Sequence, residues 1–240
     1  MFFNFVALTN MVKGVPMKKA IIFDLDGTLV DTAQDLMTAG NAFFQEMGFG
    51  SLFSKGQHEA VAIGGGRAMI RYGLETSHQE VTEEILDFFY PKLLKHYEEC
   101  LADTSYVYPE VENVLVKLKN LGWELGVCTN KPAYLAKELL ERLNLGNYFS
   151  SLVGSDTFPY KKPDPRALID TIKLLNADVR NSVFIGDTKT DRDTASAAGV
   201  PIIMVQFGHG ALNHNLHSLE PDAIINNFSE IPDLAKSLIN

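Results

Sequence analysis

The feature that most constrains the fold is an apolar run at residues 20–23 (Ala-Ile-Ile-Phe), followed at once by Asp24, Asp26, Gly27 and Thr28. A continuous apolar run of this kind is typical of a parallel strand that is buried on both faces. Ligands of open α/β sheets bind at the carboxyl ends of such strands. The segment therefore predicts an α/β fold whose functional groups follow its first strand.

Asp24 and Asp26 are close enough to repel each other unless a cation or a shared proton relieves the repulsion. We therefore expect a divalent metal here. Gly27 lets the chain turn sharply, and Thr28 adds a hydroxyl and an amide near the same place. The alternative is a solvated turn, because Asp and Gly are common turn formers.

From Tyr108 onward, helical and strand-like segments alternate. Repeated strand-helix units predict a parallel sheet with right-handed crossovers and helices on both faces, a Rossmann-like core. The expected strands are 123–129, 151–154, 182–186, 201–205 and 223–225, and the expected helices are 110–121, 132–143, 165–175, 191–198 and 231–239.

Residues 31–105 show no strand-like alternation and are expected to form an all-helical cap domain inserted after the first strand. Thr32 to Asp35 resembles a capping box, with Asp35 in place of the usual Glu. Further helices are expected at 67–74 and 83–101, where Pro91 should kink or divide the helix. The predicted division is an N-terminal extension at 1–16, a catalytic core at 17–30 and 106–240, and the cap at 31–105.

The net charge of −9 argues against nucleic-acid binding, which draws on clustered Lys and Arg. No stretch approaches the roughly 18 apolar residues of a membrane span. Cys100 and Cys128 have no metal-type spacing and fit reduced core thiols, so a cytoplasmic protein is expected. The apolar segment 1–16 lacks the basic start of a signal peptide and is interpreted as an accessory arm or the result of an upstream start.

Three later strand ends also carry polar groups. Thr129 and Asn130 precede a helix N-terminus, where backbone amides favour anions, and so form a candidate phosphate-binding site. They could instead cap that helix. Lys162 could neutralise both the acids and a bound dianion, or it could belong to a solvated surface pair. Asp187 and Asp191 are spaced to face one crevice and suit Mg²⁺, which takes oxygen ligands; otherwise they form a turn and an N-cap.

The order Asp-x-Asp-Gly-Thr, Thr, Lys and Gly-Asp-x-x-x-Asp, each after a strand, resembles the phosphatase branch of the haloacid dehalogenase-like superfamily. The resemblance extends from Lys18 to the C-terminus. Because dehalogenase members lack the second aspartate of the pair, the presence of Asp26 disfavours dehalogenation.

The resemblance implies a role for each motif residue. Asp24 would be the nucleophile that forms an aspartyl-phosphate, and Asp26 would be the general acid and then the general base. Thr129 and Lys162 would hold the phosphoryl oxygens. The remaining expected site residues are Thr28 and Asn130 toward the substrate, Asp24, Asp187 and the backbone carbonyl of Asp26 toward Mg²⁺, and Asp191 in support of the metal shell or Lys162.

Residues 62–67 (Ala-Ile-Gly-Gly-Gly-Arg) resemble the cap loop of phosphoglycolate phosphatases, as do Thr-Asn-Lys-Pro at 129–132 and Lys-Pro-Asp-Pro at 162–165. Arg67 could meet a substrate carboxylate, or the loop could be a hinge or a helix start. The implied function is Mg²⁺-dependent hydrolysis of a small phosphorylated metabolite, 2-phosphoglycolate foremost, by a monomer or homodimer. The alternatives are a sugar-phosphate phosphatase or phosphomutase of the same superfamily, and a non-catalytic protein that binds phosphate or metal.

Overall fold

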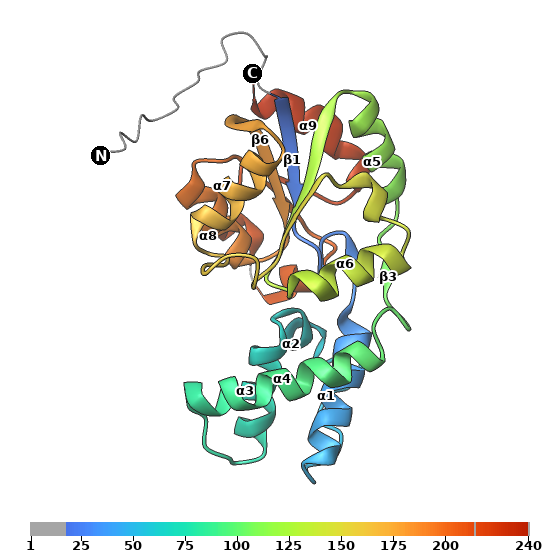
Figure 1. The fold of residues 1–240 in the computed structure, drawn as a ribbon, viewed down its shortest axis with the longest axis vertical. Helices are drawn as coiled ribbons and strands as arrows, with labels where there is room; N and C mark the ends of the chain where they lie inside the picture. Colours follow the sequence, from blue (N-terminus) through green and yellow to red (C-terminus); the bar gives the residue numbers. More distant parts are fainter. Residues whose placement is uncertain (1–17, 214, 240) are drawn as a thin grey trace, which may run out of the picture.

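The computed structural model describes residues 18–213 and 215–239, so the predicted extension 1–16 lies outside the described residues. Figure 1 shows a sheet flanked by helices and, at one end of it, a separate group of helices. Within the described part of the chain, no helix combines the length and the apolar character that a membrane span needs.

The core of the described residues is a six-stranded parallel sheet in the order β5-β4-β1-β6-β7-β8. Strand β1 lies at its centre, between β4 and β6, and its residues 20–23 are fully buried, as the apolar run predicts. Strand β6 starts five residues before its predicted beginning, because polar residues precede its apolar part. The strands are β1 (Lys18–Phe23), β4 (Trp123–Cys128), β5 (Ser151–Val153), β6 (Ala177–Gly186), β7 (Ile202–Val205) and β8 (Ala223–Ile225).

Helices cover both faces of the sheet, because successive strand residues point to opposite sides. Ile21 and Phe23 belong to the apolar cluster under α5, α6 and α9, whereas Ala20 and Ile22 belong to the cluster under α7 and α8. The predicted parallel α/β core is confirmed, with helix boundaries within two residues of the expected ones. These helices are α5 (Val111–Asn120), α6 (Ala133–Arg142), α7 (Pro165–Leu174), α8 (Lys189–Ala198) and α9 (Ile231–Leu238).

The helical group below the sheet in Figure 1 is the cap, entered and left through the short antiparallel pair β2 (Val30–Asp31) and β3 (Tyr106–Val107). The expectation that this part of the chain is helical is confirmed, although the short helix α2 had not been predicted. The domain boundaries remain predictions. The cap helices are α1 (Ala33–Glu46), α2 (Glu59–Ile63), α3 (Gly66–Thr76) and α4 (Glu83–Glu99).

Two local features of the cap differ from the predicted ones. Helix α4 runs through Pro91 without division, because the buried side chains of Leu86, Leu93 and Tyr97 anchor both of its halves, and the alternative of a kink at Pro91 stays a prediction. The capping box at Thr32 does not form, since no side-chain bond caps α1. Instead, Asp35 is buried and accepts hydrogen bonds from the residues that lead into β3.

Candidate active site

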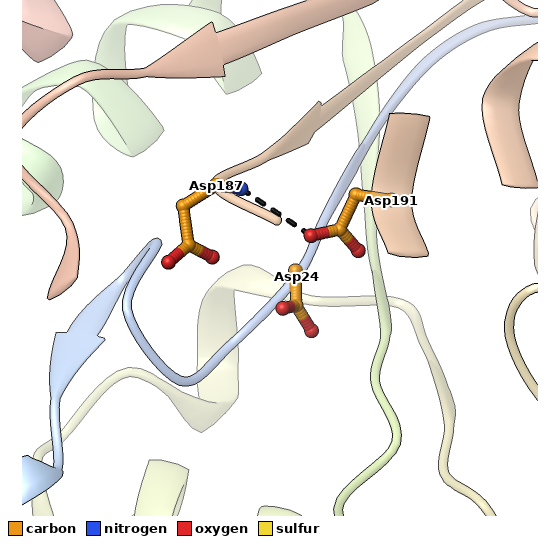
Figure 2. Close-up of side chains that lie close together, drawn as sticks. All are labelled: Asp24, Asp187 and Asp191. Carbon is orange, nitrogen blue, oxygen red and sulfur yellow. Dashed lines mark hydrogen bonds between the residues drawn. The ribbon is translucent and has the colours of Figure 1, made fainter. Parts of the chain in front are cut away.

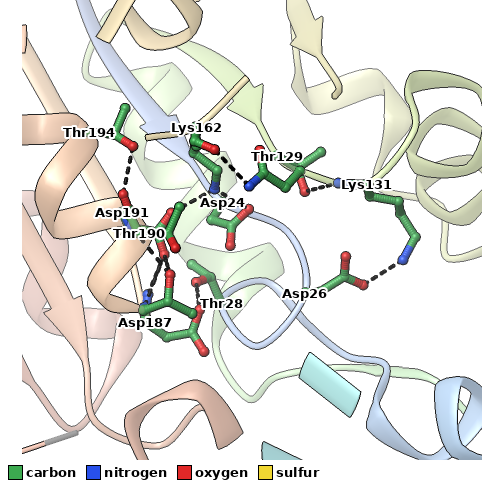
Figure 3. A network of polar contacts seen from close by, with 12 residues as sticks. Asp24, Asp26, Thr28, Thr129, Lys131, Lys162, Asp187, Thr190, Asp191 and Thr194 are labelled. Carbon is green, nitrogen blue, oxygen red and sulfur yellow. Dashed lines mark hydrogen bonds and ion pairs between the residues drawn. The ribbon is translucent and has the colours of Figure 1, made fainter. Parts of the chain in front are cut away.

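Three neighbouring strands deliver the predicted motifs to one edge of the sheet. Asp24 follows β1, Thr129 follows β4 and Asp187 follows β6, and β1 pairs with both other strands. Lys162 reaches the same place from the loop between β5 and α7. Figure 3 shows the resulting polar network, to which the first turn of α8 adds Asp191. The carboxyl ends of the strands thus form one site, as expected for this kind of sheet.

Three carboxylates form the centre of this network. Asp24, Asp187 and Asp191 each offer an oxygen within 4.8 Å of the others, and all three side chains are buried (Figure 2). Burial raises the pKa of Asp24 to about 6; Lys162 opposes the shift and the charge of Asp191 adds to it. The pKa of Asp187 lies well above its ordinary value for the same reason, with repulsion from Asp191 and Asp24 in addition. Both shifts show that ionising these carboxylates in a buried cluster costs free energy even beside Lys162.

The donor set fits a hard divalent cation. Asp24 Oδ1 is buried and accepts no hydrogen bond from any described residue, although Lys162 Nζ lies 2.8 Å from it in an ion pair. Clustered carboxylate oxygens are the ligands that Mg²⁺ prefers. Asp24 and Asp187 could therefore hold a divalent cation, and its identity as Mg²⁺ stays a prediction.

Asp187 is held from several sides. Thr28 Oγ1 donates to its Oδ1 at 3.0 Å, and the backbone N–H of Gly210 donates to its Oδ2 at 3.0 Å. Gly27 has φ +83°, and a Cβ there would lie 2.3 Å from Asp187 Oδ2. Glycine is thus required at position 27 for both the turn and the close approach. Thr28, expected to contact substrate, orients the Asp187 carboxylate in this structure.

Asp191, itself one of the three carboxylates, forms an ion pair with Lys162. Lys162 Nζ lies 2.6 Å from Asp191 Oδ1, and its side chain is only 3% exposed. Burial opposes its positive charge, but the carboxylates of Asp191 and Asp24 raise the pKa of Lys162 above its ordinary value. The other oxygen of Asp191 forms a capping box with Thr188 at the start of α8. Lys162 is therefore a fixed cation beside two of the three clustered carboxylates.

Thr129 and Asn130 complete the far side of the site. Thr129 is buried and lines the cavity, and its Oγ1 accepts a hydrogen bond from the backbone of Lys131. Asn130 Nδ2 donates to the backbone carbonyl of Lys162 at 3.0 Å and so fixes that loop. Neither caps α6, whose N-cap is Pro132. The capping alternative therefore does not apply.

Asp26 lies apart from the three-carboxylate cluster, as Figure 3 shows. Its Oδ1 accepts hydrogen bonds from Thr32 Oγ1 at 2.6 Å and from Lys131 Nζ at 2.7 Å. Lys131 is buried, and although burial opposes its charge, Asp26 raises its pKa above the ordinary value. Lys131 belongs to the Thr-Asn-Lys-Pro segment at 129–132, but no role was predicted for it. Its position directly after Thr129 and Asn130 was the available signal.

A cavity of about 150 Å³ lies between the core and the cap. Its core side includes Asp24, Asp26 and Thr129, and its cap side includes the loop 64–66. Arg67 is not among the described residues that line this cavity. Its guanidinium pairs with Glu83 and Asp87 on the cap. The substrate role of Arg67 stays a prediction that this geometry does not favour.

This fold and site define a phosphatase of the haloacid dehalogenase-like superfamily. The family model for haloacid dehalogenase-like hydrolases matches residues 21–205, and the chain belongs to that family, which confirms the resemblance seen in the sequence. Among its curated relatives, the phosphoglycolate phosphatase of Mesorhizobium japonicum is 35% identical over 91% of this chain and 96% of that protein. The phosphoglycolate phosphatase of Neisseria meningitidis is 37% identical over 89% and 92%.

A solved structure supports the same fold. The crystal structure of a predicted phosphoglycolate phosphatase from Haemophilus somnus matches with a TM-score of 0.78 and 25% identity. The match covers 92% of this chain and 99% of that one. The core and the helical cap are therefore both features that this chain shares with the solved structure.

Proposed function

We propose that the chain is a Mg²⁺-dependent phosphatase that hydrolyses a small phosphate monoester, 2-phosphoglycolate foremost, through an aspartyl-phosphate on Asp24. The observation that carries the proposal is the placement of Asp24 and Asp26 on the same cavity, one beside Lys162 and the other beside Lys131. The names of the curated relatives support phosphoglycolate as the substrate.

In the first step, an oxygen of Asp24 attacks phosphorus and the bond to the ester oxygen breaks. Asp26 gives its proton to that leaving oxygen, which departs as an alcohol. Lys162 and Thr129 bind the phosphoryl oxygens. Bound Mg²⁺ would supply positive charge to the phosphoryl group and to the crowded carboxylates.

In the second step, Asp26 takes a proton from water, whose oxygen attacks phosphorus. The bond between phosphorus and Asp24 breaks, and inorganic phosphate leaves. Covalent catalysis suits this reaction because uncatalysed hydrolysis of phosphate monoesters is among the slowest reactions known. Asp26 is placed for both proton transfers because it faces the cavity beside Asp24.

The test is release of inorganic phosphate from a panel of esters by the purified chain, with Mg²⁺ and with a chelator. We expect turnover of 2-phosphoglycolate only with Mg²⁺ and without any bisphosphate activator, which a phosphomutase would need. Asp24→Asn should lose both turnover and the acid-stable trapping of labelled phosphate on the protein. Asp193→Asn, an exposed acid paired with Lys189, is the matched control. Full turnover by Asp24→Asn would refute the nucleophile assignment.

A further inference from the structure

Tyr97 presents a buried hydroxyl with nothing to bind. It lies on cap helix α4, is 2% exposed and lines the cavity. Its hydroxyl has no hydrogen-bond partner among the described residues. Buried polar groups nearly always have a partner, so an orphaned hydroxyl on a cavity wall indicates an acceptor that arrives with a ligand. Burial raises the pKa of Tyr97 to about 12, so the hydroxyl keeps its proton at neutral pH.

Lys131 stands beside this hydroxyl on the core side. Its Nζ lies 4.5 Å from the centre of the Tyr97 ring and donates to Asp26. An ammonium group carries three donors; Asp26 accepts one, and the Tyr97 oxygen interacts with this ammonium and helps to raise its pKa, which leaves the Tyr97 proton and at least one Lys131 donor free among the described residues. The Lys131 side chain is 5% exposed, so the remaining donors are not turned toward bulk water. Lys131 and Tyr97 thus offer unused donors to one end of the cavity.

The other cations near the site lie away from the end of the cavity that Lys131 and Tyr97 line. Lys162 pairs with Asp24 and Asp191 at the phosphoryl end, and Arg67 pairs with Glu83 on the cap surface. Among the described residues, Lys131 is therefore the cation placed to meet the part of the substrate that is not transferred. That part of the substrate should carry negative charge.

We propose that Lys131 and Tyr97 together bind a carboxylate on the leaving group of the substrate. The inference rests on the proposed function, because it takes the ester oxygen to lie beside Asp26, which protonates it. In a phosphorylated 2-hydroxy acid, one carbon separates that oxygen from the carboxylate carbon. Lys131 Nζ is 2.7 Å from Asp26, so a carboxylate so close to the ester oxygen falls within its reach.

The arrangement also joins the two halves of the molecule. Lys131 comes from the loop between β4 and α6 of the core, and Tyr97 comes from α4 of the cap. A carboxylate held by both would bridge cap and core. Esters without this group would leave the Tyr97 hydroxyl proton and a Lys131 donor unpaired, and the site would discriminate against them.

The test compares two ligands, 2-phosphoglycolate and ethyl phosphate, bound to the full chain in the Asp24→Asn background and in Mg²⁺. Asp24→Asn is used so that binding is measured by calorimetry without turnover. We expect Lys131→Met to weaken 2-phosphoglycolate binding by about tenfold or more, and Tyr97→Phe by a factor of about three, consistent with loss of charged and neutral hydrogen bonds. The ratio of the two dissociation constants should fall toward one in both variants.

Lys137→Met and Tyr148→Phe, which alter an exposed lysine and the hydroxyl of a half-buried tyrosine away from the cavity, are the matched controls and should keep the wild-type ratio. An equal loss for both ligands, or no loss, would overturn the proposal. Tyr97→Phe keeps the ring and gives an independent reading if Lys131→Met fails to fold. If the wild-type chain hydrolyses no ester but the ratio still depends on Lys131 and Tyr97, the proposed catalysis fails and the carboxylate site stands.

Discussion

Lys162 Nζ lies 2.8 Å from Asp24 Oδ1, at the carboxyl end of the central strand. This single ammonium also serves Asp191, so the three-carboxylate cluster keeps an excess of negative charge. Burial raises the pKa of Asp24, and the charge of Asp191 adds to the shift although Lys162 opposes it. A second cation would stabilise the ionised form of Asp24, so metal binding and proton release should be linked.

The apparent affinity for Mg²⁺ should rise as the pH rises through about 6. Because the pKa of Asp24 is raised to about 6 in the metal-free protein, a proton must leave before the metal binds, and each released proton changes affinity about tenfold per pH unit. Asp187 is shifted in the same direction and would steepen the dependence. Calorimetric Mg²⁺ titrations between pH 5 and about 8 check this.

The sign for stability is the opposite in the metal-free protein. The folded-state pKa of Asp24 exceeds its ordinary value of 3.8, so the folded chain binds the extra proton between these two values. Its contribution to stability is therefore present at low pH and is lost as the pH rises to about 6. In Asp24→Asn, the contribution of this carboxyl to the pH dependence of Mg²⁺ affinity and to the pH dependence of stability should be absent. Mg²⁺ affinity that stays constant from pH 5 to about 7 would contradict the assignment.

Asp26→Asn should slow hydrolysis of alkyl phosphates far more than that of aryl phosphates. An amide cannot donate the catalytic proton, and loss of a general acid typically costs about 10²- to 10⁴-fold in kcat. A nitrophenolate leaves without protonation. The rate at which p-nitrophenyl phosphate phosphorylates Asp24 should therefore fall much less. The measurement is the burst rate on each substrate. Equal losses on both substrates would mean that Asp26 does not act as the acid.

The sequence was most informative where chemistry follows a strand. The buried run 20–23 and the polar residues after it were sufficient to predict the central strand and the placement of Asp24, because parallel strands end at a common edge. Side-chain direction in the cap was not predictable in this way. Arg67 turns toward Glu83, and Tyr97 toward the cavity, because of how α3 and α4 pack together, which no local pattern encodes.

The same limit explains the two partners of Asp26. Thr32 fits the pattern of a helix cap, yet its hydroxyl binds Asp26, six residues earlier. Lys131 is 105 residues from Asp26 in the chain, and the pairing of β1 with β4 brings the two together. Local propensity predicts a helix cap at Thr32, and lysine is a residue type common on surfaces. Tertiary contacts override both tendencies and place the two side chains on Asp26.

Arg67→Ala should leave the Michaelis constant for 2-phosphoglycolate unchanged. The guanidinium pairs with Glu83 and Asp87. Arg67 is not among the described residues that line the cavity. Loss of these exposed pairs should lower the free energy of unfolding by no more than about 1 kcal/mol. Steady-state kinetics and urea unfolding measure the two effects. A rise in the Michaelis constant with unchanged stability would instead support direct contact with the substrate.

Gly210→Ala should weaken Mg²⁺ binding without unfolding the protein. The backbone N–H that bonds Asp187 would remain, but a Cβ at position 210 would lie 2.2 Å from Asp187 Oδ2, closer than atoms can approach. The carboxylate must then move, and because it is a proposed metal ligand, the affinity for Mg²⁺ should fall. Gly146→Ala is the matched control, since its Cβ would meet nothing nearer than 3.6 Å. Equal Mg²⁺ affinity in the two variants would show that the position of Asp187 does not set metal binding.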